Sequence, residues 1–157
     1  VGDDSAADVV AEEDSAAPGK KSGMSLQSGA PRGASTTWHT GRISDGGTIY
    51  AGVDNPKGTR GFYYICDREG RSQIALVGVK RPDGRMAIAV GKKRFPFEFT
   101  RDGDGYHLTD VRPQAAVMKA LRSGKWVRVF VDGDVRIMRL RLKGSSAALA
   151  EAVRLCR

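Results

Sequence analysis

The chain has 157 residues, of which 40% are hydrophobic and 28% are charged, and its formal net charge at pH 7 is +8. This length fits a single domain with some chain to spare. The mean hydropathy is −0.37, and no apolar run approaches the roughly 20 residues that a membrane-spanning helix needs. We therefore expect neither an integral membrane protein, nor a collagen-like chain, nor a wholly disordered one.

The charge is unevenly distributed along the chain. Residues 1–37 carry six acidic and three basic side chains, a net −3, whereas residues 38–157 carry 12 acidic and 23 basic ones, a net +11. A strongly basic body favours anionic partners such as nucleic acid, lipid head groups, acidic glycans or an acidic protein face. The alternative interpretation is that the charge serves solubility alone.

The first 37 residues are predicted to be a disordered tail or linker. From Pro18 to Ser35, ten of the eighteen residues are Gly, Pro or Ser, and no aromatic residue precedes Trp38. Such a segment buries too little apolar surface to offset the entropy lost on ordering. Residues 38–157 are expected to form one basic domain. The chain begins at Val1 without an initiator methionine, which we interpret as removal of a signal peptide or trimming of the end.

The domain is predicted to be antiparallel α+β, with about eight to nine short strands and two short helices. Strands are expected at 38–43, 48–53, 61–66, 72–79, 86–90, 95–100, 106–109, 126–132 and 135–142. Pro96 lacks an amide donor, so its strand should be an edge strand or a bulged one. The first helix is expected to start near Pro113 and stop at Gly124, and the last to run from an N-cap at Ser145 to about Cys156.

The two cysteines, Cys66 and Cys156, indicate a disulfide. Cys66 ends an apolar strand, and Cys156 lies on the apolar stripe of the last helix, so both are expected to face the core. A bond between them would staple the C-terminal helix to the sheet and would place the protein in the periplasm or outside the cell. The alternative is a pair of reduced, buried thiols in a cytosolic protein. Neither a metal nor another cofactor is expected, because no Cys or His pair has a ligand spacing.

The hairpin at 126–142 is the candidate binding surface. If Gly133 and Asp134 form a two-residue type II′ turn, Asp132 faces Val135. The core-facing residues are then Val127, Val129, Val131, Met138, Leu140 and Leu142. On the other face the opposed pairs are Phe130 with Ile137, Arg128 with Arg139, and Trp126 with Arg141.

Such a basic and aromatic face can bind phosphates, stacked bases or acidic sugars. The opposed Arg128 and Arg139 repel each other unless an anion or a ring lies between them, and Trp126 offers Arg141 a cation–π contact. The alternative is a face covered by the acidic tail or a helix, with its arginines lying flat over the rings. A second basic feature, Lys92-Lys93-Arg94 at a hairpin tip, is either a further partner site or plain solvated charge.

Catalysis has little support in the sequence, and we expect a protein that is not an enzyme. Cys66 could pair with His39 or His107 as a nucleophile, but a disulfide offers no thiolate. The run 102–105 (Asp-Gly-Asp-Gly) has the look of a calcium loop but lacks the later bidentate Glu, so a turn is expected there.

The order of these elements resembles a loose group of small exported bacterial envelope proteins. The segments that carry the resemblance are the Trp-led first strand, Ile49–Val53, Tyr64–Asp67 and the ending from Leu140 to Cys156. The group includes the invasion-associated locus B-like proteins and small type VI secretion accessory proteins. The resemblance implies an exported, non-catalytic accessory protein with no catalytic residues to carry over.

Two functional hypotheses follow. The first is an exported, disulfide-stapled module of the cell envelope that recognises a protein or an anionic component. The second is a cytosolic nucleic-acid-binding domain that uses the basic and aromatic face of the 126–142 hairpin.

Overall fold

The computed structural model describes residues 36–43, 47–103 and 105–156, so the predictions for residues 1–35 and for positions 44–46 and 104 lie outside it. The described elements are β1 (His39–Arg42), β2 (Ile49–Asp54), β3 (Gly61–Cys66), β4 (Ser72–Val77), β5 (Gly84–Val90), β6 (Lys93–Arg101), β7 (Tyr106–Asp110), α3 (Ala116–Ser123), β8 (Trp126–Val131), β9 (Val135–Arg141) and α4 (Ser145–Leu155). Neither described helix is long and apolar enough to cross a membrane.

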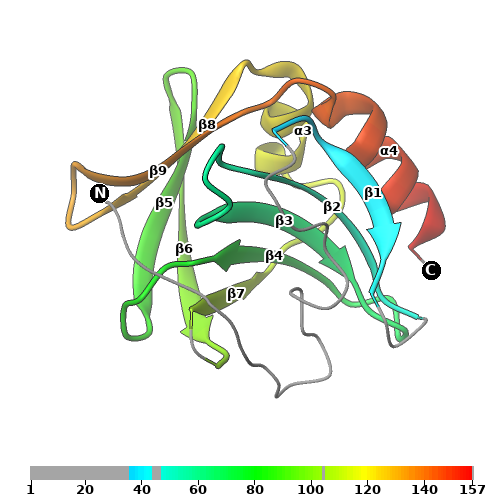
Figure 1. The fold of residues 1–157 in the computed structure, drawn as a ribbon, viewed down its shortest axis with the longest axis horizontal. Helices are drawn as coiled ribbons and strands as arrows, with labels where there is room; N and C mark the ends of the chain where they lie inside the picture. The colour runs from blue at the N-terminus through cyan, green and yellow to red at the C-terminus, as the bar shows by residue number, and fades with distance from the viewer. Residues whose placement is uncertain (1–35, 44–46, 104, 157) are drawn as a thin grey trace.

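The nine strands form one antiparallel sheet in the order β1-β2-β3-β4-β7-β6-β5-β8-β9 (Figure 1). Two departures from chain order matter: β7 lies between β4 and β6, and β5 lies between β6 and β8. With two helices packed against this sheet, the predicted α+β class is confirmed.

The sheet curls around its main core, so that its two edge regions approach each other (Figure 1). The backbone amide of Trp38 donates to the carbonyl of Lys143 at 3.1 Å, and its indole Nε1 donates to the carbonyl of Arg141 at 3.0 Å. The guanidinium of Arg60, in the β2–β3 loop, donates to the carbonyl of Ile137 in β9. These bonds close a seam between the beginning and the end of the domain.

Both helices lie at one end of the curled sheet. Helix α4 packs on β1, β2, β3 and α3, and the buried hydroxyl of Ser145 donates to the carbonyl of Leu121 in α3 at 2.6 Å. The predicted N-cap role of Ser145 is therefore wrong, because Gly144 with φ of 84° is the cap and Ser145 is the first helical residue. The predicted start near Pro113 is also wrong: α3 begins at Ala116.

Cys66 and Cys156 form a disulfide, with their Cα atoms 5.7 Å apart across a separation of 90 residues. Cys66 is buried at the end of β3, and Cys156 is the residue that caps α4. The predicted staple between the last helix and the sheet is confirmed.

A second, smaller cluster of buried side chains lies on the other side of β2, β3 and β4. Its members are Ile43, Tyr50, Tyr63, Ile65 and Ala75. The phenol of Tyr63 donates to Asp54 at 2.9 Å, and its ring lies so close to Gly52 that a Cβ atom there would meet the ring at 2.2 Å. Glycine at position 52 is therefore required by the approach of this ring.

The strand that contains Pro96 was predicted to be an edge strand or a bulged one, and the structure shows an edge. Strand β6 is paired along its length with β5 but with β7 only at Thr100 and Arg101. The stretch around Pro96 is therefore an edge within the described chain, where a missing amide donor costs no ladder bond.

Candidate anion-binding face

Away from its tip, the β8–β9 hairpin separates its side chains by alternation between two sides. Val127 and Val129 face the core with Met138 and Leu140, and all four are buried. The opposite side carries the pairs Trp126 with Arg141 and Arg128 with Arg139, as the sequence predicts.

The tip of the hairpin differs from the prediction. Its loop has three residues, Asp132–Asp134, so Val131 and not Asp132 faces Val135, and Phe130 faces Arg136 and not Ile137. Ile137 is the extra residue of a β-bulge, and the bulge restores the expected register from Val129 onward. The same bulge brings Arg136, which sequence reasoning missed, onto the outer side.

Strand order brings the second basic feature to the same side. Ala89 of β5 pairs with Arg94 of β6 on one side and with Arg128 of β8 on the other, so these side chains share one outer row with Arg139. We call the whole surface the arginine–aromatic face; it consists of Arg94, Trp126, Arg128, Phe130, Arg136, Arg139 and Arg141. Lys92 lies in the neighbouring β5–β6 turn and Lys93 is the first residue of β6; both are exposed.

Each ring of the face carries two guanidinium groups. The Cζ atoms of Arg94 and Arg128 lie 4.1 and 5.3 Å from the centre of the Phe130 ring. The Cζ atoms of Arg139 and Arg141 lie 3.5 and 4.8 Å from the Trp126 ring. The expected contact between Arg141 and Trp126 is confirmed, and the repulsion expected between Arg128 and Arg139 is relieved because they lie on different rings.

Most of this positive charge has no carboxylate partner among the residues that the structure describes. Arg94 forms an ion pair with Asp134 at 2.9 Å, and Arg128 donates to the carbonyl of Gly91 at 2.6 Å. Within the described residues, Arg136, Arg139 and Arg141 form no ion pair, and all three are exposed. Within the described chain, Arg139 and Arg141 therefore present guanidinium edges that have no carboxylate partner and whose positions are set by the Trp126 ring.

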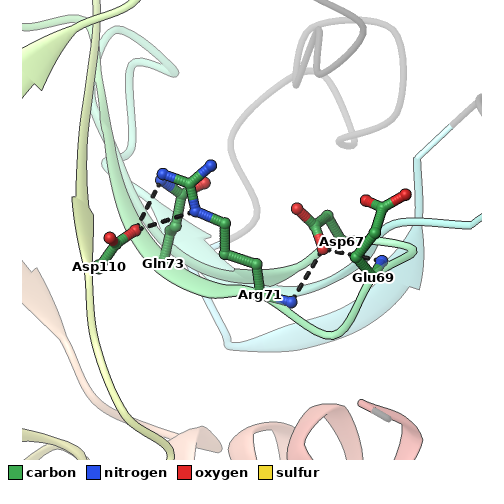
Figure 2. Close-up of polar contacts among 5 residues, drawn as sticks. All are labelled: Asp67, Glu69, Arg71, Gln73 and Asp110. Atoms are coloured by element: carbon green, nitrogen blue, oxygen red, sulfur yellow. Dashed lines mark hydrogen bonds and ion pairs between the residues drawn. The ribbon is translucent and has the colours of Figure 1, made fainter.

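A polar hollow of about 680 Å³ lies elsewhere, at the β3–β4 turn and the diverging ends of β6 and β7. Figure 2 shows Arg71 and Gln73 directed at one carboxylate oxygen of Asp110, each at 3.2 Å. Asp67 accepts the backbone amides of Glu69 and Arg71 within its own turn. Five acidic and three basic side chains line the hollow, so an anion would bind less well here than at the face.

The structure does not support Cys66 as a catalytic nucleophile. Cys66 is held in the disulfide, and His107 is fully buried with its Nε2 2.7 Å from the carbonyl of Arg81 and its Nδ1 unpartnered. Burial lowers the pKa of His107 below its usual 6.5, so this side chain is a neutral core residue near pH 7. No group of three or more potential metal ligands occurs among the described residues.

In a comparison with known protein families, a family model described as YfjT matches residues 36–149. The chain belongs to the YfjT family. The matched span includes all nine strands and the whole arginine–aromatic face of this YfjT-family chain, whereas Cys156 lies beyond it. No curated protein and no solved structure matches the chain.

Proposed function

We propose that this YfjT-family chain is an exported, non-catalytic binding module of the cell envelope that recognises an anionic partner through the arginine–aromatic face. The observation that carries the proposal is the set of four guanidinium groups on two rings, of which only Arg94 has a carboxylate partner within the described chain. Guanidinium groups fixed in advance lose little freedom when they bind an anion.

The disulfide supports the exported location. Structural disulfides persist in oxidising compartments and are rare in the cytosol. The bond between Cys66 and Cys156 joins the sheet to the last helix across 90 residues. In the periplasm or outside the cell, the anionic partners that such a module can contact are those of the cell envelope.

Charge reversal on the face tests the proposal against a matched control. The face variant replaces Arg136, Arg139 and Arg141 with Glu, and the control variant replaces Arg112, Lys119 and Arg122, which are exposed residues at or before α3. Each variant lowers the formal net charge from +8 by 6, to +2. Thermal melts first confirm that both variants fold.

Inorganic polyphosphate is the simplest probe, because it offers charge without bases or sugars. In calorimetric titrations at about 50 mM NaCl, we expect the face variant to bind about tenfold or more weakly than the parent, and the control variant to bind nearly as the parent does. Equal losses in the two variants would show that net charge alone attracts the anion. That outcome, or no binding by the parent, would refute the proposed role of the face.

A further inference from the structure

We infer that the anion is an acidic polysaccharide that carries carboxylate groups, bound by the guanidinium edges of the arginine–aromatic face. This inference rests on the proposed function and narrows its partner class. Three features of the face distinguish among acidic glycans, nucleic acids and anionic bilayers: the covering of its rings, the alignment of its arginines across the strands, and its curvature.

The rings are already covered, which disfavours nucleic acid. Single strands are bound largely by stacking of bases on bare aromatic faces. Phe130 is only 8% exposed and lies under Arg94, while Arg139 lies 3.5 Å from the centre of the Trp126 ring. A base could stack on Trp126 only by displacing a guanidinium that is already in contact, so Trp126 and Phe130 serve as positioning residues for arginines.

The arginines are arranged to suit carboxylates. A guanidinium that lies over a ring keeps its in-plane N–H groups at the edge, where they can form the bidentate pair that a carboxylate prefers. Arg128 and Arg139 occupy directly paired positions on neighbouring strands, and Arg94 lies in the same row two strands from Arg128. This row crosses neighbouring strands, so a polymer with a carboxylate on each sugar can contact more than one guanidinium group.

The shape of the face disfavours a bilayer. The main core fills the inner side of the curled sheet, so the arginine–aromatic face lies on its outer, convex side (Figure 1). The hollow described above is lined by other residues. A flexible polymer can follow a convex surface across several strands, whereas a flat bilayer would touch only part of it.

The test compares four probes on the full chain: polygalacturonate, inorganic polyphosphate, an oligothymidylate and vesicles with about one-third anionic phospholipid. All are matched in total anionic charge and measured at about 50 mM NaCl. We expect polygalacturonate to bind at least about fivefold more tightly than the oligonucleotide and the vesicles.

A conservative variant separates recognition by the planar guanidinium group from recognition of charge alone. Replacing Arg136, Arg139 and Arg141 with Lys keeps every charge but removes the planar fork. We expect polygalacturonate binding to weaken about fivefold or more, because a lysine ammonium group cannot form the bidentate pair.

The outcomes distinguish this inference from the proposed function. Tightest binding to the oligonucleotide, lost in Trp126→Ala, would overturn the inference in favour of base stacking, and preferred binding to vesicles would overturn it in favour of a membrane. Equal polygalacturonate binding by the parent and the Lys variant would also overturn it. In all three cases an anion would still bind the face, whereas failure of every probe, polyphosphate included, would refute the proposed function itself.

Discussion

The disulfide should supply a large part of the stability of this domain, and its removal gives a quantitative prediction. The perturbation is the double replacement Cys66→Ala and Cys156→Ala. For a loop of 90 residues, the chain-entropy relation gives about 4–5 kcal/mol of stabilisation at 25 °C. Whole domains are commonly stable by only about 5–15 kcal/mol, so the variant should be marginal.

The assay is urea unfolding followed by tryptophan fluorescence, with thermal melts alongside. Trp38 is a suitable reporter because it is 5% exposed and lies at the seam that α4 adjoins. For a domain of this size we expect the melting temperature to fall by about 15–20 °C. The parent protein in excess reductant should approach the same value.

Two results would contradict this reasoning. The first is alkylation of both thiols in the native protein without reductant, which would show that the bond does not form in solution. The second is a fall in the unfolding free energy of less than about 1 kcal/mol, which would show that the bond does not restrain the unfolded chain as the loop-entropy argument requires.

Three further changes test the packing. Gly52→Ala puts a Cβ atom 2.2 Å from the ring of Tyr63 and should lower the free energy of unfolding, measured in urea, by about 1–3 kcal/mol. The control Gly84→Ala has open space around its Cβ position and should change that free energy by less than about 0.5 kcal/mol. Equal effects of the two substitutions would refute the ring contact. Burial lowers the pKa of His107 in the folded state, so the unfolded chain takes up the proton first and stability should fall as the pH drops below about 6.5. Denaturation curves at pH 7 and pH 5 should show a smaller fall for His107→Leu, and an unchanged difference would exclude this residue as the cause. Ser145→Ala removes the buried bond to α3 and should cost about 1 kcal/mol in the same unfolding assay; no measurable loss would show that the bond contributes nothing net.

Local pattern was enough to predict each of the described strands, because period-two alternation and turn residues are short-range signals. It was also enough to pair Trp126 with Arg141 and Arg128 with Arg139. The tip of that hairpin was predicted wrongly, because a three-residue loop and a one-residue bulge shift the register in opposite directions. From Val129 toward Trp126 the two shifts cancel, so the pairing there is the same as for a two-residue turn without a bulge.

Contacts between strands that are distant in sequence could not be predicted in this way. Arg94 reaches Phe130 because β5 lies between β6 and β8, and no local pattern specifies that order. The predicted helix termini were wrong for a related reason. Gly144 accepts the left-handed backbone at the start of α4, and this frees the hydroxyl of Ser145 for a carbonyl in another helix.

The seam between the two ends of the sheet has a consequence for synthesis. Trp38 bonds to the backbone of Arg141 and Lys143, Thr40 bonds to the carbonyl of Ala148, and Cys66 bonds to Cys156. During translation these early residues leave the ribosome long before their partners exist. The first three strands must therefore wait with apolar surface uncovered, and chaperones have their opportunity in that interval.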